Sequence, residues 1–188
     1  MYRCVDEAVF GKAVDMINGF KDYFLRHGEA VYENPSPGNK AGGISTLEDK
    51  SCGCVQKGGT APIVDVIGYG ESVSARGLHM LCGPGNDLVS ATALTAAGAH
   101  MVLFTTGRGT PFGAPAPTVK IATNTPLAVK KAGWIDFNAG TVADGTRTPE
   151  EAAAELMELV LATASGKETR TEVCGFREIS IFKDGIVL

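Results

Sequence analysis

Apolar side chains near the start of the chain recur at nearly helical spacing. The series comprises Val9, Phe10, Ala13, Met16, Ile17, Phe20 and Phe24. Positions three or four apart share one face of a helix, so this pattern predicts a helix over residues 5–27. Because the chain changes character after this segment, we expect residues 1–30 to form a leading helical arm. Residues 31–188 are then expected to form a single α/β domain.

Residues 32–43 carry no such periodicity. Two prolines and three glycines interrupt this stretch, which predicts a loop. In the run Ser45-Thr46-Leu47-Glu48, the serine and the glutamate have the spacing of a helix capping box. We therefore expect a helix to begin at this point and to be short, because Gly53 and Gly58-Gly59 soon follow.

Short apolar runs alternate with helical patterns through the rest of the chain. Strands are predicted at residues 61–68, 77–83, 100–106 and 117–123, with one or two more in 172–188. Helices are predicted at residues 88–97, 126–131 and 148–164. The run at 100–106 is the clearest candidate for a buried strand. Nearly all-apolar strands that alternate with helices are typical of the α/β class, so we expect a mostly parallel sheet with helices on both faces.

Composition and charge narrow the function classes. The chain has 188 residues and a net charge of −4, which argues against a general binder of nucleic acid or of membrane surfaces. No apolar run is long enough to span a bilayer, and residues 1–7 lack the apolar core of a secretory signal. The five cysteines include no CxxC pair. These features favour the reducing cytoplasm over a disulfide scaffold.

Two strand ends carry unusual sequences, at the positions where an open α/β sheet binds ligands. Residues 81–87 form a glycine-rich turn before a helix, and such a turn can receive an anion on its backbone N–H groups. The same turn could instead be a plain connection in which Asn86 or Asp87 caps the helix. Residues 104–113 place two threonines and Arg108 directly after a strand. The guanidinium matches a carboxylate or a phosphate, and the alternative is a solvated arginine in a flexible turn.

Lysines form a second set of candidates. Lys50 and Lys57 could bind an anionic substrate, or one of them could act as a base if burial lowers its pKa. Exposed lysines on a helix face are commoner. Lys120 is different, because a lysine inside an apolar strand must be paired or lie at a strand end in a site. Asp136 and Asn138 alternate along a short extended piece and are expected to face the same side.

The sequence signals a metal site only weakly. The three histidines are scattered singly, and Cys52-Gly-Cys54 lacks the usual zinc spacing, so ordinary buried thiols are expected. The glycine patterns of P-loops, dinucleotide-binding folds and serine nucleophile elbows are also absent from the sequence.

Four motifs in order give the chain a resemblance to a known family. They are NPSPGNKAGGISTLEDKS at 34–51, FTTGRGTPFG at 104–113, KIAT at 120–123 and DFNAG at 136–140. With these motifs the chain resembles the C-terminal part of the altronate/galactarate dehydratase family, from about residue 30 to its end. The same family includes the large subunits of sulfolactate sulfo-lyases.

The resemblance implies a hydro-lyase on a Rossmann-like variant of the α/β sheet, with a divalent metal that is typically iron(II). Such an enzyme converts a small-molecule sugar acid, such as altronate or galactarate, into a 2-keto-3-deoxy acid. The chemistry needs a base for the proton next to the carboxylate and cationic groups for the enolate-like charge. It also needs an acid for the departing 3-hydroxyl.

Carried onto this chain, the resemblance implies a role for each matching residue. Arg108, Thr105 and Thr106 would hold the substrate carboxylate. Asn39, Asp49 and Lys50 would line the site, with Lys50 or Lys57 as the catalytic base. Lys120 and Asn138 would complete the polar wall, and Asp49 would contact the metal.

The resemblance covers only the C-terminal part of the family's catalytic region. The remaining N-terminal half is expected on the same polypeptide or on a separate subunit, and the chain alone is expected to be inactive. The apolar face of residues 1–30 could pair with a second copy, so a homo-oligomer stays open. The competing interpretations are a non-catalytic module that binds an anion or a nucleotide, a sulfolactate sulfo-lyase subunit, and a structural assembly domain.

Overall fold

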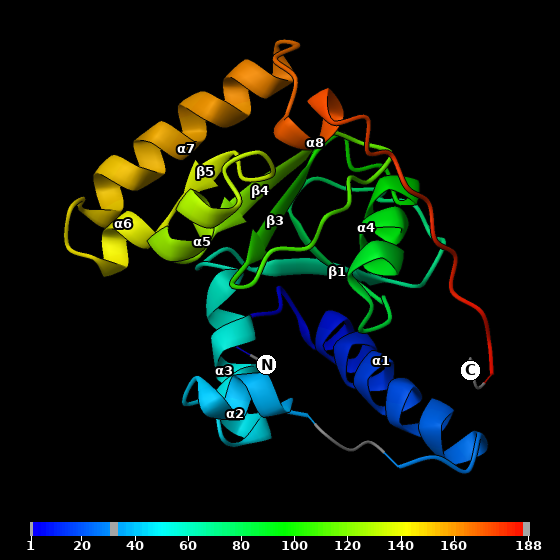
Figure 1. Ribbon diagram of the computed structural model, residues 1–188. Coiled ribbons are helices and arrows are strands. Elements are labelled where there is room, and N and C mark those ends of the chain that lie inside the picture. Colours follow the sequence, from blue (N-terminus) through cyan, green and yellow to red (C-terminus); the bar gives the residue numbers. More distant parts are fainter. Residues whose placement is uncertain (1, 31–33, 186–188) are drawn as a thin grey trace. The chain divides into compact units, whose positions relative to one another are not determined.

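A computed structural model describes residues 2–30 and 34–185 (Figure 1). The chain divides into two compact units, one made of Met1–Cys82 with Lys183–Leu188 and one made of Gly83–Phe182. This division lies elsewhere than the boundary expected after residue 30, and the leading arm stays a prediction. None of the helices in the described residues combines the length and the apolar character needed to cross a membrane.

Helix α1 (Glu7–Arg26) confirms the helix expected at the start of the chain. The Asp6 carboxylate begins it by accepting a hydrogen bond from the backbone N–H of Val9, at 2.8 Å. Val9 and Ala13 are its buried residues, and the helix packs against strand β1 (Ile63–Ile67). The start of the apolar series therefore marks the packed face, whereas Ile17 and Phe20 further along the helix are 51% and 40% exposed.

Two short helices occupy the next part of the same unit. Helix α2 (Pro37–Ala41) lies within the segment expected to be a loop, so that expectation is wrong. Helix α3 (Leu47–Lys57) is capped by Thr46 and not by Ser45. It continues through Gly53, because a single glycine costs a helix only about 1 kcal/mol. It ends at Lys57, directly before Gly58, so the short helix expected here is confirmed.

Strands β1 and β2 (Leu78–Leu81) pair in parallel and form the sheet of this unit. Cys4 adds an isolated parallel bridge to Ile63. Both strands lie within apolar runs that the sequence marked as strands. The connection between them runs from Gly68 to Gly77 and contains no helix.

The unit Gly83–Phe182 contains a parallel sheet in the order β3-β4-β5. The strands are β3 (Val102–Thr106), β4 (Thr118–Ala122) and β5 (Phe137–Asn138). All five residues of β4 are buried because the strand lies between two others. Within this sheet β3 is an edge strand and Leu103 is 50% exposed, so β4 and not residues 100–106 is the clearest buried strand.

Helices cover both faces of this sheet (Figure 1). Ala91 of α4 (Asp87–Ala96) packs with Val102 on one face. Ala152 of α7 (Pro149–Ala164) packs with Val119 on the opposite face. Helix α5 (Thr125–Lys130) lies on the α4 face, where Leu127 packs with Ala122. This arrangement confirms the α/β class and the parallel pairing, while the Rossmann-like variant stays a prediction.

The β3–β4 loop (residues 107–117) contains no helix. Because the two strands are parallel, this loop must return along the sheet to reach the start of β4. Phe112 and Ala114 of the loop are buried against Ala91 and Val102. The loop therefore covers the α4 face, in the place that a crossover helix usually takes.

Two short helices complete this unit: α6 (Gly140–Ala143) follows β5, and α8 (Arg170–Val173) follows α7. Residues 174–185 are irregular, so the terminal strands expected in 172–188 are absent from the described residues, and 186–188 lie outside them. Glu178 nevertheless anchors the segment, because its backbone N–H donates to the Gly113 carbonyl at 2.8 Å and its carboxylate accepts from the Gly113 N–H at 3.0 Å. These two bonds bind the segment to a loop, so no strand ladder continues from them.

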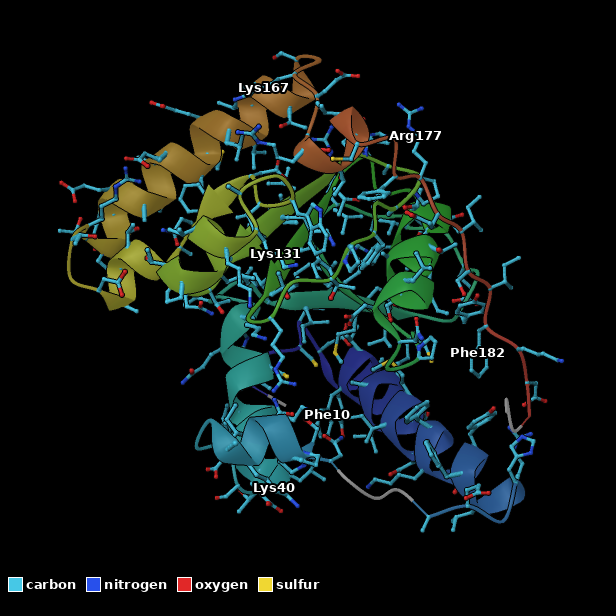
Figure 2. All side chains as sticks on the ribbon, viewed as in Figure 1. Phe10, Lys40, Lys131, Lys167, Arg177 and Phe182 are labelled. Carbon is cyan, nitrogen blue, oxygen red and sulfur yellow. The ribbon has the colours of Figure 1, made fainter. Side chains whose placement is uncertain are left out.

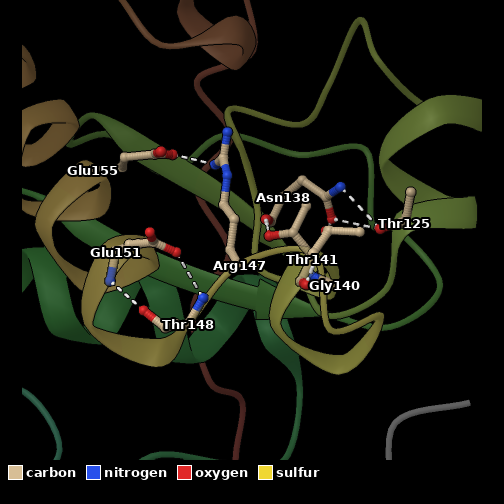
Figure 3. Close-up of polar contacts among 9 residues, drawn as sticks. Thr125, Asn138, Gly140, Thr141, Arg147, Thr148, Glu151 and Glu155 are labelled. Carbon is tan, nitrogen blue, oxygen red and sulfur yellow. Dashed lines mark hydrogen bonds and ion pairs between the residues drawn. The ribbon is translucent and has the colours of Figure 1, made fainter.

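The start of α7 provides a local test of the fold. The Thr148 hydroxyl accepts from the Glu151 N–H at 3.2 Å, and the Glu151 carboxylate accepts from the Thr148 N–H at 2.9 Å (Figure 3). Thr148→Ala is therefore expected to lower the free energy of unfolding by about 1 kcal/mol in urea unfolding. Thr148→Ser keeps the hydroxyl and serves as the control. Equal stability of the alanine variant and the wild type would contradict the expected contribution of the cap.

Candidate functional site

The structure places the residues expected in the site in two groups, one in each compact unit. The unit that contains α1–α3 holds Asn39, Asp49, Lys50 and Lys57. The unit that contains the three-stranded sheet holds Thr105, Thr106, Arg108, Lys120 and Asn138.

In the first group, two hydrogen bonds orient the side chain of Lys50. Its ammonium donates to Oδ1 of Asn34 at 2.7 Å and to Oδ1 of Asn39 at 3.2 Å. Both acceptors are neutral amides, so they orient the ammonium without neutralising its charge. Lys57 is exposed at the last residue of α3 and lies about 10 Å further along the helix axis. Because of this separation, only one of the two lysines could remove a given substrate proton. Which of them acts as the base is untested.

Asp49 is exposed in the first turn of α3, where its backbone N–H donates to the Thr46 hydroxyl at 3.1 Å. Across residues 2–30 and 34–185, no three His, Cys, Asp or Glu side chains come together in a way that could hold a metal ion. The described residues therefore do not by themselves fit the divalent metal that the resemblance implies. Iron(II) with Asp49 as its contact stays a prediction.

Arg108 lies in an anchored turn at the carboxyl end of β3. The Gly109 N–H donates to the Thr106 hydroxyl at 2.9 Å, and the Asn124 amide donates to the Gly107 carbonyl at 3.0 Å. The Arg108 side chain is exposed and has no hydrogen bond or ion pair with any residue of the described part of the chain. A free guanidinium on an anchored turn can bind a carboxylate in a fork without ordering the loop first.

The two threonines before this turn have different surroundings. Successive strand residues point to opposite faces, so Thr105 and Thr106 are directed away from each other. The Thr106 hydroxyl is already engaged by the turn, whereas Thr105 is exposed. Their expected part in holding a substrate carboxylate stays a prediction.

Asn138 joins the ends of β5, α5 and α6 (Figure 3). Its side-chain amide donates to the Thr125 hydroxyl, and its Oδ1 accepts from the Gly140 N–H, both at 3.0 Å. Thr125 also donates to the Asp144 carboxylate. These bonds engage both ends of the Asn138 side chain within the protein, and its expected contact with substrate is untested.

Lys131 is a residue that the sequence analysis missed (Figure 2). A Cβ atom on Gly109 would lie 3.8 Å from Cγ of Lys131 and 4.0 Å from the Trp134 ring, so both side chains flank the Arg108 turn. The Lys131 ammonium stands 4.2 Å from the centre of the Trp134 ring. A second cation thus lies beside the turn. The only signal for it in the sequence was a lysine at the end of a predicted helix, which usually marks the surface.

Lys120 is fully buried, with 0% of its surface exposed. Its ammonium donates to the Thr110 carbonyl at 2.7 Å and stands 3.8 Å from the centre of the Phe112 ring and 4.3 Å from that of Phe104. Burial lowers the pKa of Lys120 to about 8, although the carboxylates of Asp87, Asp136 and Glu178 act in the opposite direction. The groups in contact with the ammonium are all groups of the protein itself. The expected contact of Lys120 with substrate is untested.

Asp136 supports the backbone on which Lys120 lies. Its carboxylate accepts from the Lys120 N–H at 2.8 Å and from the Arg170 N–H at 2.7 Å. Burial raises the pKa of Asp136, while these two hydrogen bonds oppose the rise. The Asn138 side chain binds Thr125 and Gly140 instead. The two residues therefore serve different parts of the fold.

The shifted pKa of Lys120 makes stability depend on pH. In the unfolded chain the lysine keeps its proton up to a pKa near 10.5, whereas the folded protein releases it near pH 8. Between these values the unfolded chain binds more protons, so the free energy of unfolding rises with pH. From about pH 7 to about pH 10 the wild type is expected to gain on the order of 2 kcal/mol relative to Lys120→Met. Urea unfolding of both proteins checks this, and parallel pH profiles would contradict it.

Comparison with known proteins decides the family. The family model described as "D-galactarate/Altronate dehydratase, C-terminal" matches residues 1–187. The chain belongs to this family. The match confirms the resemblance that the four motifs indicated. The chain corresponds to the C-terminal part of the family's members.

Three relatives show how closely the family members agree. The chain is 55% identical over all 188 residues to the altronate dehydratases of Escherichia coli (strain K12) and Bacillus subtilis (strain 168), and it covers 38% of each. It is 38% identical over 167 residues to the galactarate dehydratase (L-threo-forming) of Escherichia coli (strain K12), which is 88% of this chain and 32% of that relative. The chain thus spans less than two fifths of the length of these relatives.

Proposed function

We propose that the chain is the C-terminal part of a sugar-acid dehydratase whose substrate is altronate. The family match supports a dehydratase of sugar acids. The higher identity to two altronate dehydratases than to a galactarate dehydratase favours an acid with one carboxylate over an acid with two. The other catalytic groups then come from protein beyond these 188 residues, and the chain by itself is inactive.

The proposed reaction removes water across two neighbouring carbons of the sugar acid. A base takes the proton from C2, the hydroxyl leaves C3 as water with a proton from an acid, and the resulting enol takes up a solvent proton at C3 to give the 2-keto-3-deoxy acid. As the proton leaves C2, negative charge develops on the carboxylate, so a cation bound there stabilises the transition state more than the substrate. Lys50 and Lys57 are the candidate bases.

The observation that carries the proposal is the free guanidinium of Arg108 on its anchored turn. It lies at the carboxyl end of a parallel strand, where α/β sheets bind their ligands, and Lys131 flanks the same turn. In this proposal Arg108 binds the substrate carboxylate in a fork and holds C2 in place for proton removal. Lys131 adds positive charge beside it.

The test is a graft in which this chain replaces the matching segment of the Bacillus subtilis altronate dehydratase. At 55% identity the segment is expected to fold on that protein. The graft should convert altronate into the keto acid with kcat/KM within about tenfold of the intact relative, and should prefer altronate to galactarate. The 188-residue chain assayed alone should show no turnover.

Each failure has a distinct meaning. A folded graft that converts neither acid, beside an active intact relative, would contradict the dehydratase proposal. A graft that prefers galactarate would contradict the assignment of altronate alone. Turnover by the isolated chain would contradict the proposal that other catalytic groups are needed.

A further inference from the structure

Lys120 is a charged side chain without a carboxylate in contact. Lysine is almost never fully buried unless its charge is paired. The described residues place no carboxylate within ion-pair distance of its ammonium, and the closest groups are a carbonyl and two aromatic faces.

The contacts of the ammonium join the sheet to the β3–β4 loop. Lys120 of β4 lies in register with Phe104 of β3, so the two side chains share the α4 face of the sheet. Thr110 and Phe112 both belong to the loop that follows Arg108. The Phe104 and Phe112 rings also meet edge to face, with centres 5.1 Å apart. One ammonium therefore fixes both the backbone and a ring of the loop.

The remaining anchors of the loop lie on either side of this contact. The turn at Arg108 is anchored through Gly109, and Gly113 is bound by Glu178. Lys120 holds the stretch between these anchors. Without its ammonium, residues 110–112 would keep the hydrogen bond from the Phe112 N–H to the Thr110 carbonyl, which lies within the stretch, and apolar packing against the sheet.

We infer that Lys120 is a positioning residue, which clamps the β3–β4 loop so that Arg108 is held where a substrate carboxylate binds. Its side chain is fully buried, so it acts through the loop and not by contact with substrate. The link to substrate rests on the proposed function, whereas the clamp is a property of this chain and can be tested without activity.

Trypsin provides the test on the chain itself, because Arg108 is exposed and the bond after it lies in the clamped loop. Lys120→Met removes the charge and the donor but keeps a side chain of similar size. We expect cleavage after Arg108 to become about tenfold faster, the size expected for the loss of a hydrogen bond to a charged group. Cleavage after Arg76, exposed in the β1–β2 connection, should stay unchanged as the internal control.

Global stability separates a clamp from a general structural role. Replacing a buried charge by an apolar side chain is often neutral or stabilising, so Lys120→Met should melt at the same temperature as the wild type or higher while its loop opens faster. If the variant instead unfolds and both sites are cleaved faster, Phe112→Leu carries the test. That variant keeps the lysine, removes one ring and should accelerate cleavage after Arg108 alone. If Lys120→Met is folded, unchanged cleavage after Arg108 would overturn the clamp. If Lys120→Met unfolds, unchanged cleavage after Arg108 in Phe112→Leu would overturn it.

Kinetics of the graft test the link to substrate. Lys120→Met should raise KM for altronate about tenfold and leave kcat within about twofold, because bound substrate must first bring the loose loop back to the position in which Arg108 acts. A fall in kcat with unchanged KM would overturn the positioning role, since Lys120 would then take part in the chemistry. If the graft without the substitution is inactive, the proposed function fails, and the trypsin result still decides the clamp.

Discussion

Arg108→Ala in the graft is expected to lower kcat/KM for altronate by about a hundredfold. The guanidinium is exposed, has no partner within the described residues and lies on a turn fixed by Gly109 and Thr106. Its removal leaves the fold intact and takes away a charge-assisted fork on the substrate carboxylate, an interaction of roughly 2–3 kcal/mol. Steady-state kinetics with altronate measure the loss.

Two control variants define what the loss means. Arg108→Lys keeps the positive charge without the planar fork, so it should fall between the wild type and Arg108→Ala. Arg76→Ala removes another exposed arginine and should leave kcat/KM unchanged. If Arg108→Ala retained full activity in an active graft, the assignment of the carboxylate site to this turn would be wrong.

Gly140→Ala is expected to destabilise the protein by about 3 kcal/mol or more. A Cβ at this position would lie 2.2 Å from the backbone nitrogen of Thr125 and 2.4 Å from the carbonyl carbon of Asn124, distances that the packed backbone must widen. Such overpacking in a tight region costs roughly 1–3 kcal/mol and more where backbone must move. The shift would also disturb the hydrogen bond from Gly140 to Asn138.

Gly133→Ala is the matched control, because a Cβ there meets nothing within 4 Å. It should change the free energy of unfolding by no more than about 0.5 kcal/mol. Urea unfolding of the two variants beside the wild type measures the difference. Equal stability of Gly140→Ala and Gly133→Ala would show that α5 and α6 do not need their close backbone approach.

Local signals explain which elements the sequence could predict. Helix α7 has its Thr148 cap, Pro149 at its first position and acidic residues in its first turn, and the structure places it at the expected residues. Helix α4 follows its Asn86 cap for the same reason. The C-terminal segment is irregular although its sequence predicts strands, because an apolar run shows hydrophobicity but not the presence of a pairing partner. Glu178 binds a loop, which no local pattern shows.

In the site, too, local sequence patterns reveal some residues, whereas the contacts of others depend on segments far apart in the sequence. Lys120 was recognisable as unusual because it interrupts an apolar strand, but its partners Thr110 and Phe112 come from a loop whose path depends on the parallel pairing of β3 and β4. Lys131 looked like an ordinary surface lysine, and only the packing around Gly109 shows that it flanks the Arg108 turn. The Lys50–Asn39 contact lies within one sequence motif, which is why both residues could be named together.

The most direct test of the account is the product that the graft forms from altronate in D2O. We predict a 2-keto-3-deoxy acid with one deuterium at C3, because the enol must take a solvent proton when it becomes the ketone. NMR of the product resolves this position, and the intact Bacillus subtilis relative provides the reference. No keto acid from a folded graft, or a keto acid without deuterium at C3, would contradict the proposal that this chain completes a sugar-acid dehydratase.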